Sequence, residues 1–343
     1  MEFKKLERVS FRDKFLNCYD KYLSLSEYQS IAIGIYKDGK YYIFGNGILD
    51  THMYDIGSIS KTMAAHLILK LADLNFIDLN LSVDKYLDLE KGNYPTINEL
   101  LTHSAGYNNL TPIEITLPSL LKHGYSRKNI YEKTVNTDII KALNKRRNHK
   151  HKNKYGYSDF AYAILALVAE KVTNTKYSQL LYEFIQNDLR LTETKLTLND
   201  NRYPYSVSKN KIIKNWNWQL NNPYLFSGGV VSNIKDMLKY ISHQIESSEN
   251  YIVNAHSVSV QVETRNNLKI CKGWHTYKKS NQLWHVGGVG TFRSSIIVNK
   301  KKKIGVVVLG NTKGISKANI HYITKMLYSE LKIKKIKIQE NSK

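Results

Sequence analysis

Two apolar runs of strand length near the start of the chain predict two strands. Ile31–Tyr36 and Tyr41–Gly45 are apolar runs of strand length, and the Lys37–Lys40 segment between them contains an Asp-Gly pair. Asp-Gly is a preferred dipeptide of tight hairpin turns because both positions tolerate positive φ. We therefore predict a β-hairpin over residues 31–45.

Beyond this hairpin, apolar residues recur at the spacing of an α-helix. A strongly helical stretch runs from about Ser58 to Leu74, and a longer one runs from Asp159 to about Ile185 with a break near Asn174. Two short helices are predicted between them, on either side of a turn at Asn93–Pro95. These short helices are Leu79–Leu87 and Thr96–His103.

Strand patterns return in the last third of the chain. The predicted strands are residues 258–263, 268–277, 283–285, 292–299 and 304–309, and a final helix covers roughly 316–332. This order predicts an α+β fold, in which an antiparallel sheet built from both chain ends is flanked by helices and carries an inserted, mostly helical subdomain. A cleft between two such parts is a usual place for a small-molecule site.

The length of the chain favours one composite domain over residues 1–343. We predict that its α/β part comprises about residues 20–75 and 225–332, and that the helical insert comprises 76–224. Residues 333–343 are predicted to be a basic tail.

The composition, 42% hydrophobic and 23% charged, is ordinary for a soluble globular protein. The N-terminus has no apolar core of signal-peptide length, and no apolar run is long enough to span a membrane. Cys18 and Cys271 lie far apart, so no disulfide framework is indicated. We expect a reduced, cytoplasmic protein.

The net charge of +22 invites comparison with proteins that bind nucleic acid. The charge is diffuse, and its two concentrations, Lys145–Lys154 and Lys332–Lys337, are expected to be a solvated loop and tail. No recognition motif accompanies them, so we expect no nucleic-acid partner. His149 and His151 lack a carboxylate or cysteine at ligand spacing, and we expect no metal site there.

A serine and a lysine three residues apart follow a glycine at the start of the first predicted helix. Ser58 and Lys61 therefore share one face of the first helical turn. A hydroxyl is a weak nucleophile until a base takes its proton, and an unprotonated lysine can be that base. The helix N-terminus disfavours the ammonium form of Lys61 and stabilises negative charge on Ser58. The alternative is a helix-capping serine beside a solvated lysine.

Two further segments carry residues that are candidates for proton transfer or substrate binding. Tyr157 and Asp159 lie where a polar turn enters the long apolar helix, and a tyrosine hydroxyl near a lysine can relay protons. His285 begins a His-Val-Gly-Gly stretch, in which Gly287 and Gly288 would let a substrate backbone approach closely. Taken singly, such a tyrosine is more often structural and such a histidine more often packed or exposed.

Together these pieces resemble the serine β-lactamase-like family, which includes class C β-lactamases, related penicillin-binding proteins, esterases, D-stereospecific peptidases and acyltransferases. The resemblance covers about residues 30–331 and keeps the family's motif order. The matching segments are Gly57–Lys61, Glu99–Gly106, Tyr157–Leu165, Ser227–Asp236, His285–Ser294 and Val306–Asn311. It implies a β-lactamase/transpeptidase-like fold and a single catalytic domain.

The resemblance also implies a covalent acyl-enzyme cycle without a metal or organic cofactor. Ser58 would attack a carbonyl carbon, Lys61 and Tyr157 would share the proton transfers, and the backbone N–H groups of Ser58 and Gly288 would form the oxyanion hole. The triplet that begins at His285 occupies the strand position of Lys-Thr-Gly or His-x-Gly in relatives. A histidine there removes a fixed positive charge, which disfavours a carboxylate-bearing β-lactam as natural substrate and leaves esters and peptides open.

Asp159 departs from the family pattern, in which the tyrosine motif usually ends in asparagine. An ionised carboxylate only accepts hydrogen bonds, whereas an amide also donates them. An ionised Asp159 would raise the pKa of Lys61 and hinder its role as base. Alternatively, Asp159 could bind a substrate amine, or Tyr157 could be the principal base with Lys61 as its cationic partner.

We therefore expect a serine hydrolase or acyltransferase that acts on an ester or amide of a small metabolite or peptide. A D-stereospecific peptidase and a β-lactamase are alternatives within the same chemistry. The alternative from another class is a catalytically silent binding protein. His103 is expected to be structural, behind the nucleophile, and Cys271 has no catalytic context.

Overall fold

The structure is a computed structural model of the chain. It describes residues 1–46, 51–107, 112–123, 129–148, 154–197, 206–208, 210–259, 267–278, 280–316 and 318–333. The predicted loop histidines His149 and His151 and most of the predicted basic tail lie outside these residues.

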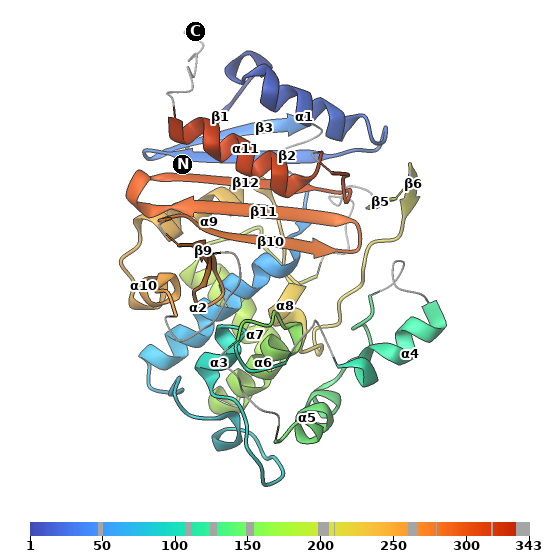
Figure 1. The fold of residues 1–343 in the computed structure, drawn as a ribbon, viewed down its shortest axis with the longest axis vertical. Coiled ribbons are helices and arrows are strands. Elements are labelled where there is room, and N and C mark those ends of the chain that lie inside the picture. Colours follow the sequence, from blue (N-terminus) through green and yellow to red (C-terminus); the bar gives the residue numbers. More distant parts are fainter. Residues whose placement is uncertain are drawn as a thin grey trace.

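An eight-stranded sheet crosses the upper half of the molecule in Figure 1. Its order, β1-β3-β2-β12-β11-β10-β9-β8, places strands from the two ends of the chain side by side at β2 and β12. All neighbours are antiparallel except β1 and β3, which are parallel, so the sheet is mixed rather than purely antiparallel. The strands are β1 (Phe3–Lys5), β2 (Ile31–Lys37), β3 (Lys40–Asn46), β8 (Leu268–Ile270), β9 (His275–Tyr277), β10 (Leu283–Val289), β11 (Phe292–Asn299) and β12 (Ile304–Gly310).

Helices cover both faces of the sheet. The alternation of β2 sends Ile33 and Ile35 into a core beneath α1 (Asp13–Leu23) and α11 (Ile320–Ile333). Gly34 points the other way and faces Leu238 of α9 (Ile234–Glu246), because a Cβ there would lie 2.8 Å from that side chain. The small residue lets α9 pack closely on the sheet.

The helical part lies below the sheet in Figure 1. Its two central helices, α2 and α6, are buried on nearly every side, as expected of helices that are apolar all round. The helices of this part are α2 (Ser60–Asp73), α3 (Ile97–Leu101), α4 (Ile113–His123), α5 (Asn136–Lys145), α6 (Asp159–Thr173), α7 (Tyr177–Glu183), α8 (Leu225–Gly228) and α10 (Asn250–His256). A π-helical turn, Phe184–Asp188, extends α7.

Short elements complete the chain. Two small antiparallel pairs join β4 (Tyr54–Asp55) to β7 (Val231–Ser232) and β5 (Ser206–Ser208) to β6 (Lys211–Ile213). Single 3-10 turns are formed by Arg8–Ser10, Gly57–Ile59, Val83–Lys85 and Lys300–Lys302.

The predicted α+β fold class is confirmed, and so are several of its local features. The predicted hairpin is β2–β3, and positive φ angles at Asp38 and Gly39 match its Asp-Gly turn. The long helix breaks where predicted, because Asn174 adopts a left-handed conformation that ends α6. The predicted Thr96–His103 helix is the shorter α3, which begins with a capping box between Thr96 and Glu99.

Other predicted elements are wrong in part. Residues 79–87 contain only a 3-10 turn, because Val83 N donates to Pro95 O and Leu81 O accepts from Ile97 N, so the backbone pairs with the following segment. Gly273, with φ of 79°, splits the predicted strand 268–277 into β8 and β9. The last helix starts at Ile320 rather than near 316, because Asn319 Oδ1 accepts from Tyr322 N and caps it.

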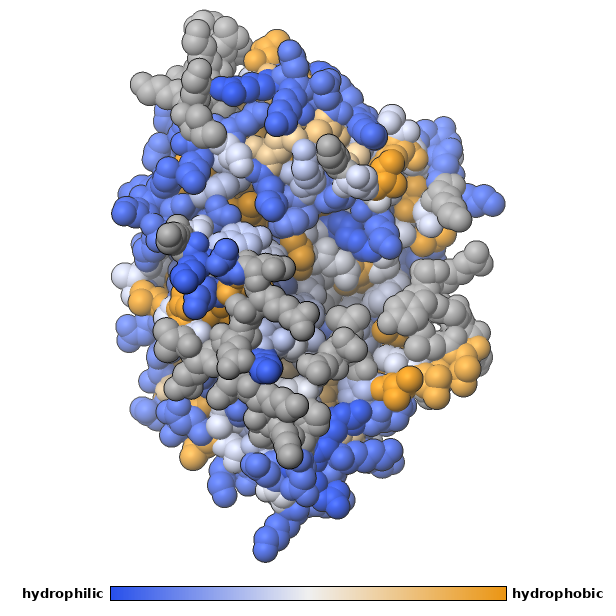
Figure 2. Space-filling model, in the orientation of Figure 1, coloured by the Kyte–Doolittle hydropathy of each residue, from blue (hydrophilic) through white to orange (hydrophobic). Residues whose placement is uncertain are grey.

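The visible face is mostly hydrophilic, with an apolar patch over α4 at its lower right (Figure 2). Ile113, Leu117 and Leu121 expose 66%, 41% and 80% of their surface there, at a spacing of four residues. None of the described helices has both the length and the apolar character to cross a membrane.

Candidate active site

Ser58 lies on a tight turn at the start of α2. The 3-10 turn Gly57–Ile59 runs directly into α2 at Ser60, and Gly57 enters it with φ of 52°, a conformation that glycine adopts without strain. A Cβ on Gly57 would lie 2.5 Å from Gly288 N, so the turn and β10 touch through their backbones. Ser58 is half-buried and lines a cavity of about 690 Å³.

Lys61 is fully buried one turn further along α2. Its Nζ lies 3.1 Å from Ser58 Oγ, 2.5 Å from Asp159 Oδ1 and 2.7 Å from Ser227 O. Tyr157 presents its ring to the same nitrogen, with 4.9 Å between Nζ and the ring centroid. The lysine is thus fixed by three polar partners from three separate segments of the chain.

Asp159 is the first residue of α6 and is itself nearly buried. Its Oδ1 accepts from Lys61, and its Oδ2 accepts from the Tyr131 hydroxyl at 3.0 Å. The Ser158 side chain caps α6 by accepting a hydrogen bond from Ala161 N. This cap fixes the start of the helix and therefore the position of Asp159. The carboxylate therefore serves as the fixed partner of the lysine.

The hydrogen-bond geometry around Lys61 Nζ suits both the protonated and the neutral form of the amine. An ammonium would donate to all three partners, whereas a neutral amine would donate to Asp159 and Ser227 and accept from the Ser58 hydroxyl. Burial lowers the pKa of Lys61 below its ordinary value, and Asp159 offsets part of that shift. Lys61 is therefore placed to take a proton from Ser58 without any rearrangement.

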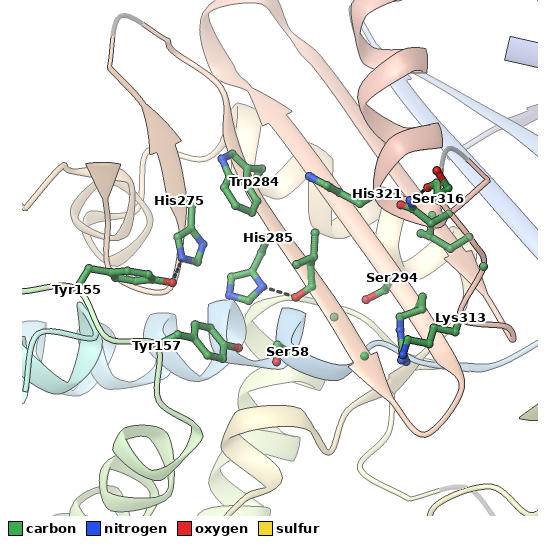
Figure 3. A pocket seen from close by; sticks show the side chains of 17 residues that line it. Ser58, Tyr155, Tyr157, His275, Trp284, His285, Ser294, Lys313, Ser316 and His321 are labelled. Atoms are coloured by element: carbon green, nitrogen blue, oxygen red, sulfur yellow. Dashed lines mark hydrogen bonds between the residues drawn. The ribbon is translucent and has the colours of Figure 1, made fainter. Parts of the chain in front are cut away.

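Tyr157 reaches the same serine from the helical part of the fold. Its hydroxyl points toward Ser58 in Figure 3, and the oxygen is buried without a hydrogen bond of ordinary geometry to any residue that the structure describes. Burial and the nearby Asp159 raise its pKa well above the ordinary value, which the Ser58 hydroxyl partly counteracts. Tyr157 is therefore a neutral phenol that can donate or relay a proton.

His103 holds Tyr157 from behind, as expected of a structural residue. The two ring centroids are 4.6 Å apart, and His103 Nδ1 accepts from Ser158 N at 3.2 Å. Burial lowers the pKa of His103 well below its usual range, so the imidazole is neutral. Its ring fixes the tyrosine by packing rather than by charge.

His285 lies on β10 and lines the cavity in its neutral form. Its Nδ1 donates to Val286 O at 2.8 Å, since a carbonyl oxygen can only accept, and Nε2 is therefore the lone-pair nitrogen. Burial and the nearby His275 lower the pKa of His285 well below the ordinary value. His285 Nε2 is buried and has no partner within the described ranges.

Gly287 and Gly288 bring β10 against the nucleophile turn. A Cβ on Gly287 would lie 2.0 Å from Ile56 O and 2.3 Å from Ser294 Oγ, so only glycine fits there. β9 pairs with β10 only at Trp284, which leaves the edge of β10 beyond that residue unpaired with β9. The Gly288 backbone therefore lies beside Ser58, where the sequence resemblance places the oxyanion hole.

The structure brings together the side chains that the sequence singled out, namely Ser58, Lys61, Tyr157, Asp159 and His285. Sequence reasoning missed Tyr131, which carries no motif and reaches Asp159 only through the fold. It also missed the pair in which Tyr155 Oη and His275 Nε2 lie 2.9 Å apart at one end of the cavity, although Tyr155 is two residues from the tyrosine motif.

Two other sequence-based expectations concern metal and thiol chemistry. Among the described residues, no group of three or more His, Cys, Asp or Glu side chains is placed to hold a metal ion. Cys271 is buried, and burial raises its pKa to about 12, which leaves the thiol protonated and unreactive.

The chain belongs to the Beta-lactamase family, whose model matches residues 20–325. Among curated relatives, Protein flp from Staphylococcus aureus (strain MRSA252) is 25% identical over 86% of this chain and 61% of its own length. A teichoic acid D-alanine hydrolase from Staphylococcus aureus is 31% identical over 55% of this chain and 47% of that protein. This chain thus spans about three-fifths, or less, of the length of these relatives.

Solved structures share the fold. The octameric penicillin-binding protein homologue from Pyrococcus abyssi has a TM-score of 0.76 and 22% identity, and the match covers 94% of this chain and 78% of that one. A beta-lactamase/D-alanine carboxypeptidase from Pseudomonas syringae has a TM-score of 0.75 and 14% identity, with 94% and 98% of the two chains covered. The β-lactamase/transpeptidase-like fold expected from the sequence is confirmed.

Proposed function

We propose that this protein is a serine hydrolase or acyltransferase that forms an acyl-enzyme on Ser58 with an ester or amide. The observation that carries the proposal is the 3.1 Å approach of Ser58 Oγ to the buried Lys61 Nζ, with Asp159 as the third member. A nucleophile, a base and a group that orients the base form the usual arrangement for acyl transfer. Since α2, α6 and β10 all contribute, we propose one catalytic domain.

The first step transfers the Ser58 hydroxyl proton to Lys61 Nζ while Oγ bonds to the carbonyl carbon. The π electrons move onto the carbonyl oxygen, where the N–H groups of Ser58 and Gly288 would stabilise the negative charge. Collapse of this intermediate breaks the bond to the leaving group, which takes a proton relayed from Lys61 through Tyr157. Water, or another hydroxyl or amine, then attacks the acyl-enzyme by the same steps in reverse.

Asp159 would keep Lys61 in place by accepting a hydrogen bond from its Nζ. The same carboxylate also raises the pKa of Lys61, against the stronger effect of burial. Burial and the charge of Asp159 therefore act in opposite directions on the pH at which Lys61 becomes a base.

Replacement of Asp159 by asparagine is expected to retain or increase activity on neutral esters at neutral pH. The substitution removes the influence that raises the pKa of Lys61, so burial lowers that pKa further and a larger fraction of Lys61 is unprotonated. The acidic limb of the kcat/KM profile should then move to lower pH. Asp188→Asn is the matched control, because Asp188 pairs with Lys70 far from the cavity. A large loss of activity in Asp159→Asn alone would show that the carboxylate takes a direct part in the chemistry.

We propose a D-alanyl ester as the first acyl group to test. The hydrolase relative carries D-alanine in its name, and so does the carboxypeptidase that shares the fold. In this chain the unpartnered lone pair of His285 Nε2 would accept a hydrogen bond from the ammonium of such a group. An ester rather than a β-lactam also fits a site whose histidine is neutral.

The test compares the p-nitrophenyl esters of D-alanine and L-alanine, together with labelling by a fluorophosphonate probe. We expect Ser58-dependent labelling, and turnover of the D-ester faster than the L-ester by about tenfold, the size of one well-placed hydrogen bond. Ser58→Ala should lose both signals, whereas Ser329→Ala, an exposed serine on α11, should keep them. Equal signals from the wild type and Ser58→Ala would contradict the proposal and favour a silent binding protein.

A further inference from the structure

One side of helix α4 is apolar and exposed to solvent. Ile113, Leu117 and Leu121 are all exposed, and their spacing of four residues places them in one stripe along the helix. Apolar residues at this spacing in a surface helix normally face the core. Here they form the apolar patch at the lower right of Figure 2. Helix α4 therefore presents to solvent the kind of surface that other helices bury.

The remaining sides of α4 attach it to the protein. Ile115 packs against the main core, and Thr116 is buried. Glu114 forms a two-pronged ion pair with Arg146, the residue that ends α5, with Nη1 to Oε1 at 2.5 Å and Nη2 to Oε2 at 3.2 Å. Because these contacts fix α4 from the inner side, the apolar stripe is held outward.

The positive charge of the protein is concentrated in the same part of the chain. Residues 113–154 contain eleven lysines and arginines against three aspartates and glutamates, which leaves +8 of the total charge of +22. These residues make up only about one-eighth of the chain, so they carry about three times their share of its charge. The charge is therefore less evenly spread than we expected from the whole sequence.

Part of this charge lies on α5, which contacts α4. Lys141 and Lys145 are exposed on α5 at a spacing of four residues, so they share one face of that helix. In Figure 2 the apolar patch is bordered below by hydrophilic surface, where Figure 1 places α5. An exposed apolar stripe and a cationic surface therefore lie side by side.

An anionic lipid bilayer matches both surfaces. Its headgroups attract lysine and arginine, and the boundary between headgroups and acyl chains takes up aliphatic side chains from a helix that lies in the membrane plane. A nucleic acid or another polyanion in water would use the charge but would leave the apolar stripe exposed. The combination of charge and apolar surface favours the membrane.

We propose that α4 and α5 form a docking surface for an anionic lipid bilayer. Ile113, Leu117 and Leu121 enter the boundary between headgroups and acyl chains, while Lys141 and Lys145 contact the headgroups. Three aliphatic side chains give reversible binding, unlike a helix that spans the bilayer. The inference is independent of the proposed function, because none of these residues lines the cavity that holds Ser58.

The test is co-sedimentation of the whole protein with lipid vesicles. Vesicles of phosphatidylcholine that contain phosphatidylglycerol are compared with vesicles of phosphatidylcholine alone. We expect the partition coefficient to be at least about tenfold higher for the anionic vesicles, as for several lysines near a charged surface. Added salt should lower it, because salt screens this attraction.

Variants separate the apolar from the cationic contribution. Leu117→Asp and Leu121→Asp should each lower the partition coefficient for anionic vesicles by about tenfold or more, the effect of leaving one leucine side chain in water. Val253→Asp is the matched control, because it adds the same charge at an exposed apolar residue of α10. Lys145→Gln should lower the coefficient by about fivefold, whereas Lys301→Gln, an exposed lysine far along the chain, should leave it within about twofold.

Each contrary result overturns the proposal. Absence of binding to anionic vesicles does so directly, and so does equal binding by wild type and Leu121→Asp. Binding that only the lysine variants weaken would show attraction to a polyanion without insertion of α4. Self-association in sedimentation velocity that Leu121→Asp abolishes, without vesicle binding, would assign the stripe to a second copy of the chain. Thermal melts check that each variant is folded, and turnover by Ser58 should be unchanged in all of them.

Discussion

Replacement of Lys61 by methionine is expected to lower kcat/KM for neutral esters by at least about a hundredfold, the lower bound for loss of a general base. Methionine has a similar length and no proton-accepting nitrogen, so Ser58 would lose its base while the buried space stays filled. The measurement is steady-state hydrolysis of p-nitrophenyl acetate beside the wild type.

The same substitution is expected to destabilise the protein by about 3–5 kcal/mol, because it strands the buried Asp159 carboxylate without its counter-ion. Of the residues that the structure describes, Tyr131 alone would remain to donate to that carboxylate. The double variant Lys61→Met/Asp159→Asn removes the stranded charge and should recover much of the lost stability, measured by urea unfolding. It should not recover activity, which separates the catalytic effect from the structural one. Wild-type turnover in Lys61→Met would show that this lysine is not the base.

Replacement of Gly287 by alanine is expected to lower kcat by about a hundredfold or more, as for the loss of an oxyanion-hole donor. The new Cβ would meet Ile56 O at 2.0 Å and Ser294 Oγ at 2.3 Å. Because Ile56 precedes the nucleophile turn, β10 and Ser58 would have to move apart. The Gly288 N–H would then no longer lie where the carbonyl oxygen develops its charge.

Gly228→Ala is the matched control for this effect. Gly228 lies in α8 close to the same turn, but a Cβ there would meet its nearest neighbours at 3.8 Å, an ordinary contact. Its kcat is expected to stay within about twofold of the wild type, as for a substitution without steric conflict. Thermal melts of both variants show whether each remains folded at the assay temperature. A folded Gly287→Ala with wild-type kcat would contradict the proposed role of this backbone.

Much of the fold could be predicted from the sequence, because interactions between residues close in the chain determine its turns and helix ends. The β2–β3 hairpin follows from its Asp-Gly turn, and the end of α6 follows from Asn174. The predicted helix over residues 79–87 is wrong because hydrogen bonds to Pro95 and Ile97, distant in sequence, replace those of a helix. Helix α1 was not predicted from the sequence, although Phe15, Tyr19 and Tyr22 recur at helical spacing and form its buried face.

The candidate site likewise contains residues that the sequence could place together and residues that it could not. Ser58 and Lys61 are adjacent on one helical turn, so their spacing alone places them together. Tyr131 carries no spacing signal, since it meets Asp159 only through tertiary packing. The sequence also suggested that Asp159 would hinder Lys61, whereas the structure shows burial as the larger influence on the pKa of that lysine, with Asp159 opposing it.

The most direct test of this account is the covalent state of Ser58 during turnover. The protein is mixed with p-nitrophenyl acetate, quenched in acid within the first turnovers, and analysed by intact mass and by peptide mapping. We predict one acetyl group on the peptide that contains Ser58, and none on Ser58→Ala. Release of p-nitrophenol at the wild-type rate by Ser58→Ala, or an acetyl group that maps to another residue, would contradict the account.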